Sequence, residues 1–224
     1  MRVSQGVNLS KLDDSIAIYK AVAHDKMGIE WAIDQLKQIN ERPVTYKPWH
    51  LVIIYGIASA FVCPLFSGNF KDMGIAGILG MVLGVMALVL APRSALYANV
   101  FEITAAMVTS FAARGFGSIR NGELFCFASI AQASIALILP GWIVLNGALE
   151  LTSKSIVSGS IRMFYAIIYS LFLGFGITIG ASIYGVMDSN ATSVTTCPHP
   201  MNNYWRFLFV PLFTLWYVSA SVLI

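Results

Sequence analysis

A proline-glycine pair interrupts an apolar segment of membrane-spanning length near the middle of the sequence. Pro140 and Gly141 separate the apolar run 125–139 from a second run, 142–151. Proline removes a backbone donor and glycine loosens a helix, so the pair predicts a break that frees backbone carbonyls near mid-span. Transporters bind substrates at breaks that face a watery cavity, whereas neighbouring helices satisfy the backbone at a simple packing kink. The pattern leaves both interpretations open.

Polar residues follow the break directly. Asn146 and Glu150 flank Gly147 and lie four residues apart, so a helix that resumes after the break carries them on one face. Arg162 begins the next predicted span on the same side of the membrane. A Glu150–Arg162 pair is geometrically feasible across the connecting loop, in which Gly159 is the expected bend. Such a pair fits a routine interfacial salt bridge as well as a proton or substrate gate.

Two further polar residues are candidates for the interior of a bundle. Glu102 lies in the third predicted span, about two turns from its cytoplasmic end. A carboxylate inside a membrane is a functional hypothesis by default, although a span that starts later would leave Glu102 at the interface. Gln132 lies eight residues before the break and is a second candidate to face the interior.

Composition identifies the kind of chain that must position these residues. Of the 224 residues, 57% are hydrophobic and only 11% are charged, and the mean hydropathy is +0.73. Soluble domains carry about 25% charged residues. The sequence therefore predicts an all-α, polytopic helical membrane bundle in which lipid is the main solvent. The net charge of +3, with no basic patch among aromatics, gives no indication of a nucleic-acid partner.

Apolar periodicity divides the chain into two regions. Residues 1–48 predict a cytoplasmic segment of two short amphipathic helices, soluble or lying on the membrane surface. Their apolar faces comprise Leu12, Ile16, Tyr19 and Ala23 in the first helix and Ile29, Ala32, Ile33 and Leu36 in the second. Residues 49–224 predict a transmembrane domain of about six spans, at 49–66, 73–91, 97–113, 123–148, 162–186 and 204–224.

Loop charges predict that the N-terminus is cytoplasmic. In that orientation the inner side holds seven Lys and Arg of residues 1–48 plus Arg93, Lys154 and Arg162, ten in all, against four on the outer side. The loop 187–203 has no Lys or Arg and contains a glycosylation sequon at Asn190, which is usable only on a lumenal or extracellular face. The two observations agree, and Asn190 is a candidate glycosylation site.

Small residues and cysteines are most simply explained by packing. Gly80 and Gly84 form a GxxxG pattern that we expect to serve contacts within the chain, although a homo-oligomer is left open. Cys63 and Cys126 lie in apolar runs and are expected to be packing residues. The motifs of hydrolases, kinases and dinucleotide enzymes are absent from the sequence, so we expect neither an enzyme nor a cofactor or metal site.

The block around the break resembles the signature of the threonine/serine exporter (ThrE-like) family. The similar residues are Leu139-Pro140-Gly141, Leu145-Asn146-Gly147, Glu150-Leu151, Val157-Ser158-Gly159 and Arg162. Lys11-Leu12-Asp13, Ile39-Asn40, Pro43 and Pro92-Arg93 are similar too. The resemblance therefore covers nearly the whole chain. Glu at position 150 and the long sequon-bearing loop resemble the fungal, pheromone-regulated branch more than the bacterial one.

The resemblance implies a function and a missing part. Bacterial members export small polar amino acids and are driven by the proton gradient, so the partners implied are such an amino acid and protons. In this hypothesis the break presents backbone groups to the substrate, and Asn146 forms a hydrogen bond with it. Glu102 or Glu150 binds the coupling proton, and Arg162 pairs with Glu150 or with a carboxylate of the substrate. Members have about ten spans, so we expect this chain to be the N-terminal part of a longer protein. The alternative is a non-transporting multi-pass membrane protein that acts as an adaptor or structural component.

Overall fold

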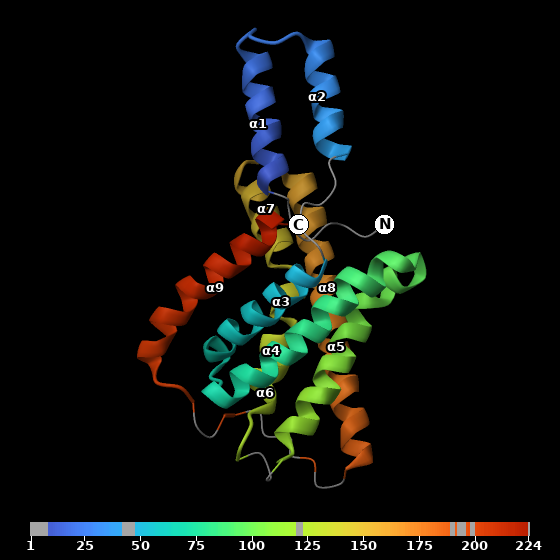
Figure 1. Ribbon diagram of the computed structural model, residues 1–224. Coiled ribbons are helices and arrows are strands. Elements are labelled where there is room, and N and C mark those ends of the chain that lie inside the picture. The colour runs from blue at the N-terminus through green and yellow to red at the C-terminus, as the bar shows by residue number, and fades with distance from the viewer. Residues whose placement is uncertain are drawn as a thin grey trace.

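The structure is a computed structural model that describes residues 9–41, 48–119, 123–188, 191, 196–197 and 200–223. Helices and their connections make up the described residues, and no strand occurs among them. Figure 1 shows a helical bundle with a two-helix hairpin projecting from one end. The prediction of an all-α bundle is confirmed.

The hairpin consists of α1 (Leu9–Ala23) and α2 (Ile29–Glu41). The two helices are antiparallel in Figure 1 and share a small core of Ile18, Ala32 and Ile39, against which Val22 and Met27 pack. The prediction of two short helices in this region is therefore confirmed. Most of the large apolar side chains predicted for their faces remain exposed.

The first two long helices pack closely through small residues. Helix α3 (Pro48–Val62) continues into the 3-10 turn η1 (Cys63–Phe66). Helix α4 (Phe70–Val85) continues into a π-helical turn, η2 (Met86–Leu90), and a 3-10 turn, η3 (Ala91–Arg93). A Cβ atom at Gly80 would lie 2.4 Å from the Ser59 Cβ atom, so α4 can approach α3 only with glycine there. Gly80 and Gly84 thus serve packing within the chain, as predicted.

Five helices and one further 3-10 turn complete the described part of the bundle. Helix α5 (Ala95–Gly117) packs along α8 (Ile156–Met187), which is 32 residues long. Between them lie α6 (Phe127–Ile135), the 3-10 turn η5 (Ala136–Ile138) and α7 (Gly141–Thr152). The last helix is α9 (Asn203–Leu223). The expected bend at Gly159 is wrong, because Gly159 lies inside α8 and the chain turns at residues 153–155 instead.

The count of about six spans is higher than the structure supports. Over the described residues, three helical segments are long and apolar enough to cross a membrane: Trp49–Phe66, Phe70–Arg93 and Ile156–Met187. A fourth results if the bent pair Phe127–Ile138 and Gly141–Thr152 forms one span. Helices α5 and α9, which correspond to the third and sixth predicted spans, are not among them. Polar residues within these two helices, such as Glu102 and Arg206, dilute their apolar character.

Candidate functional site

The predicted break is a bend of 59° between the α6–η5 segment and α7. Helix α6 ends at Ile135 and continues into the 3-10 turn η5, after which Leu139 is extended, with φ −63° and ψ 140°. Pro140 then caps α7, and its carbonyl accepts a hydrogen bond from the Val144 N–H at 3.0 Å. Proline lacks an N–H and disfavours a helical conformation in the residue before it, so the local sequence explains the bend.

The inner side of the bend packs into the largest apolar core of the bundle. Ile135 and Ile138 lie there with Phe101 of α5 and Leu173 of α8, all nearly inaccessible to solvent. Tyr97 packs against the same core, and its hydroxyl is buried without a hydrogen-bond partner among the described residues. A buried hydroxyl without a partner is costly, so this position has an unmet capacity for a polar contact.

Two glycines bring α7 and α8 together after the bend. A Cβ atom at Gly159 would lie 2.8 Å from the Gly147 carbonyl oxygen and 2.8 Å from the Leu151 side chain. The reversal between the helices uses Lys154 in a left-handed conformation, with φ 65°. Gly147, a candidate from the sequence, therefore acts as a contact point between two helix backbones, and its side of α7 is closed to a ligand.

Glu150 and Arg162 meet across the α7–α8 reversal, as the sequence predicted. The Arg162 Nε atom lies 2.9 Å from Glu150 Oε1, and the Ser158 hydroxyl donates to Glu150 Oε2 at 2.6 Å. The Arg162 side chain is 46% exposed and that of Glu150 is 27% exposed. Asn146, one turn before Glu150, is half-buried. This arrangement forms a polar cluster at an accessible end of the bundle.

The other sequence candidates lie in different surroundings. Glu102 is half-buried on α5, about two turns from the start of the helix and next to the fully buried Phe101. Gln132 is exposed, so the prediction that it faces the interior is wrong. Helix α6 buries its small and apolar residues on either side of Gln132, because these allow close contacts with α4 and η1. Gly141 is also exposed, whereas Pro140 is buried. Asn190 lies outside the described residues.

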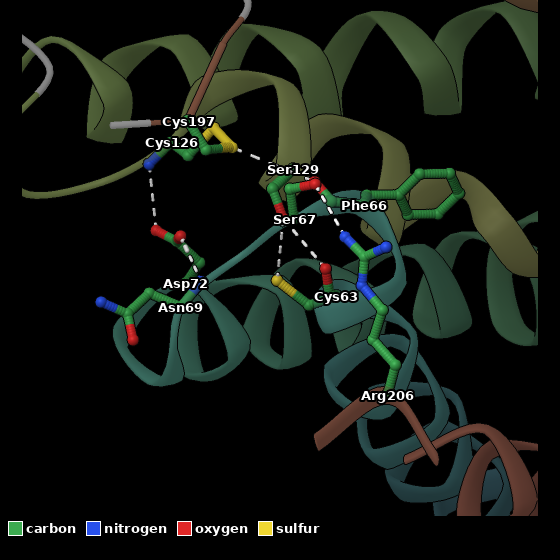
Figure 2. Close-up of a disulfide and its surroundings, with 9 residues drawn as sticks. All are labelled: Cys63, Phe66, Ser67, Asn69, Asp72, Cys126, Ser129, Cys197 and Arg206. Carbon is green, nitrogen blue, oxygen red and sulfur yellow. Dashed lines mark hydrogen bonds between the residues drawn. A yellow bond between two sulfur atoms is a disulfide. The ribbon is translucent and has the colours of Figure 1, made fainter. Parts of the chain in front are cut away.

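The opposite end of the bundle contains a disulfide between Cys126 and Cys197 (Figure 2). The prediction that Cys126 is a packing residue is therefore wrong. Cys126 precedes α6, where its thiol meets the segment that leads into α9. The bridge ties together positions 71 residues apart. Cys63 remains a free and buried thiol, in agreement with its predicted packing role, and lies 3.1 Å from the Ser129 hydroxyl.

Asp72 organises the backbone beside this disulfide, and sequence reasoning missed it. Its carboxylate accepts hydrogen bonds from the N–H groups of Asn69, at 2.8 Å, and Cys126, at 3.0 Å. The first bond belongs to a capping box that begins α4, and the second holds the start of α6 (Figure 2). The Asn69-x-x-Asp72 pattern is the signal that would have found it. Arg206 of α9 adds a bond of 3.1 Å to the Ser67 hydroxyl.

The fold and this geometry define a helical membrane bundle with a bent helix pair, α6–η5 and α7. A sequence model of the family described as "putative threonine/serine exporter" matches residues 1–184. Because the match covers more than half of the chain, the protein belongs to this family. The description of the family suggests a transporter, and the apolar helices indicate an integral membrane protein.

Fungal proteins are similar to this chain over nearly its whole length. An uncharacterised protein of Schizosaccharomyces pombe is 53% identical over 96% of this chain and 29% of its own length. Pheromone-regulated membrane protein 10 of Debaryomyces hansenii is 51% identical over 96% of this chain and 21% of its own length. The protein of that name in Saccharomyces cerevisiae is 47% identical over the full chain and 57% of its own length. The chain thus spans less than a third of the first of these relatives. No solved structure matches it.

Proposed function

We propose that this chain forms part of a proton-coupled exporter of small polar amino acids of the threonine/serine type. The observation that carries the proposal is the bend at Leu139–Pro140, within a chain of this family. A bend in a span exposes backbone groups that an adjacent substrate can use. The amino acid and the protons are the partners implied, and the remainder of a longer polypeptide would complete the transport path.

The residues around the bend suggest separate roles. Tyr97 offers a buried hydroxyl on the side of the bend that faces the core, and Asn146 offers an amide on the first turns of α7. Glu102, a carboxylate within α5, is the candidate proton carrier. Glu150 is already held by Arg162 and Ser158, so this cluster suits a gate whose contacts break when the inner end opens.

We further propose that the N-terminus and the α7–α8 reversal face the cytoplasm. The disulfide lies at the other end of the bundle, and disulfides persist in oxidising compartments outside the cytosol. Cys197 lies in the same connection as the sequon at Asn190, which is usable only on that face. Both features support the orientation that the loop charges favour.

The alternative, a non-transporting membrane adaptor, is favoured by the apolar packing at the bend. Ile135 and Ile138 are sealed among apolar side chains, so the structure has a dry contact where substrate would need to pass. Thiol labelling of Asn146→Cys in membrane vesicles separates the alternatives. The chain suits this experiment because Cys63 is buried and the other two cysteines are bridged. A transporter predicts labelling that threonine slows, whereas an adaptor predicts labelling that threonine leaves unchanged.

The transport test is threonine efflux from vesicles that contain the protein, measured with and without a pH gradient. We expect Glu102→Gln to abolish the stimulation by the gradient and Tyr97→Phe to weaken threonine transport. Glu123→Gln is the matched control, because Glu123 is exposed near the disulfide. If Glu102→Gln and Glu150→Gln both leave pH-dependent efflux unchanged, the coupling assignment is wrong.

A further inference from the structure

The α1–α2 hairpin has an apolar face that the described part of the bundle leaves uncovered. Six large apolar side chains on the two helices are between 41% and 72% exposed: Leu12, Ile16, Tyr19, Ile29, Ile33 and Leu36. They recur at spacings of three and four residues, so each helix presents them as one stripe. Scattered apolar residues on a surface need no explanation, but a contiguous set on two adjacent helices indicates a contact site.

Helical geometry places both stripes on the same side of the hairpin. Tyr19 follows the buried Ile18, and Ile33 follows the buried Ala32; Ile18 and Ala32 lie where the helices meet. One position along a helix is a rotation of about 100°. This rotation is right-handed along the chain in both helices. Because the two chains run in opposite directions and their contact residues point toward each other, the rotation places Tyr19 and Ile33 on the same side of the hairpin. Trp31 precedes Ala32 and therefore lies on the opposite face, where it is 56% exposed.

A membrane surface is a poor occupant for this face. Residues 9–41 contain four lysines and six acidic residues, which gives the hairpin a net charge of −2 apart from His24. Helices that lie on membranes carry an excess of Lys and Arg, because the cytoplasmic leaflet is anionic. In addition, the hairpin points away from the end of the bundle and runs in about the same direction as α8 (Figure 1).

We propose that the occupant is the same face of a second copy, so that two hairpins form a four-helix bundle. Charges on the outer edges of the hairpin support this pairing. Asp13 and Lys20 border the stripe of α1, and Glu30 and Lys37 border the stripe of α2; all four are exposed. The Lys11 ammonium donates to the Asn40 carbonyl oxygen at 3.0 Å and so fixes which positions lie level. Asp13 is then within one residue, or about 1.5 Å, of the level of Lys37, and Lys20 is within one residue of the level of Glu30, on opposite edges.

A two-fold axis parallel to the hairpin brings these edges together. Two copies in one membrane share the same inside-to-outside direction, so their two-fold axis lies along the membrane normal. That axis places α1 of one copy against α2 of the other at unchanged levels. Asp13 then faces Lys37 of the second copy, and Lys20 faces Glu30 of the second copy. Opposite charges border the apolar contact on both sides, as in self-complementary helical dimers.

The first test is the mass of the full chain in lipid nanodiscs or mild detergent, measured over a range of concentrations. We expect a dimer that the double variant Ile16→Gln/Ile33→Gln weakens about 100-fold, because four buried apolar side chains are lost per dimer. Both residues are exposed within one copy, so the hairpin itself should keep its helix content. Trp31→Gln is the matched control and should leave the dimer intact. A monomer at every concentration, or equal effects of the two variants, would overturn the proposal.

Charge reversal tests the pairing itself. Asp13→Lys places like charges opposite each other twice per dimer and should weaken association about tenfold. Adding Lys37→Asp to the same chain should restore it. Asp34→Lys makes the same change in net charge but lies level with Ala17, so it should have little effect. Failure of Lys37→Asp to rescue association would exclude this arrangement of the two copies.

Cross-linking tests the level of the contacts. Asp13→Cys with Lys37→Cys should form a disulfide between copies, since the two positions lie on opposite edges of one hairpin. Asp13→Cys with Glu30→Cys is the matched control, because its positions differ in level by eight residues, or about 12 Å. The three native cysteines are buried or bridged and contribute no background. Equal cross-linking by the two pairs would contradict the proposed register.

Discussion

The two ends of the transmembrane bundle are held together by different means. At one end a disulfide, a buried carboxylate and an arginine connect α3, α4, α6 and α9. At the other end a glycine contact and a partly exposed ion pair join α7 to α8. Covalent and buried polar contacts are strong, whereas exposed ion pairs contribute little. The comparison indicates that the α7–α8 end is the one that can rearrange while the disulfide end stays fixed.

Removal of the disulfide should have the largest effect on stability. Cys197→Ser opens a connection of 71 residues, for which the loss of chain entropy corresponds to about 4 kcal/mol. We expect a lower thermal unfolding midpoint in detergent, and a reducing agent should lower the midpoint of the native protein to the same degree. A midpoint that neither treatment changes would mean that the disulfide end does not limit stability.

Loss of the Asp72 carboxylate should have the next largest effect. Asp72→Ala leaves two backbone N–H groups without their acceptor, at a cost of about 3 kcal/mol. The same unfolding measurement checks this, and Glu123→Ala provides an exposed acidic control with an expected change below about 0.5 kcal/mol. Equal effects of the two substitutions would contradict the role assigned to Asp72.

A methyl group at the α7–α8 contact should have an intermediate effect. Gly159→Ala forces the Gly147 carbonyl and Leu151 apart and should destabilise by about 1–3 kcal/mol. Gly174→Ala lies on the same helix with no atom within 4 Å and should stabilise by up to about 1 kcal/mol. Opposite signs for the two variants in thermal unfolding are the expected result. The same sign would argue against a tight contact at Gly159.

The ion pair of Glu150 and Arg162 should have the smallest effect on stability. Because both side chains are partly exposed, a double-mutant cycle with Glu150→Gln and Arg162→Gln should give a coupling of about 0.2–1 kcal/mol. High salt should reduce the coupling further. A coupling above about 2 kcal/mol would show that this end is as firmly held as the disulfide end, and the proposed difference between the ends would fail.

Local signals in the sequence predicted the parts of the fold that depend on neighbouring residues. Pro140 fixed the position of the bend, and helical periodicity identified the two helices that form the hairpin. The Glu150–Arg162 pair was predictable because a short reversal brings the ends of two consecutive helices together. The roles of these residues in transport stay predictions, and so do the roles of Glu102 and Asn146.

Contacts between distant segments were not predicted. An isolated cysteine in an apolar run resembles a packing residue, so Cys126 could be paired only by noting that Cys197 lies at the same predicted face. Gln132 was wrongly expected to be buried. Small residues on α6 decide which side of this helix approaches its neighbours, and that tertiary contact cannot be predicted from the local sequence. The span count was too high for a related reason, since apolar length alone does not distinguish lipid-facing helices from partly polar ones.

Because α8 is long, the thickness of the membrane influences the geometry of the α7–α8 end. A helix of 32 residues is about 48 Å long, whereas the hydrocarbon layer is about 30 Å thick. The surplus of roughly 18 Å is taken up by tilt or by turns that emerge into the headgroups. Arg162 lies in the second turn of α8, so a change of lipid chain length moves its guanidinium along the membrane normal. Thin and thick bilayers would therefore hold the Glu150–Arg162 contact at different depths.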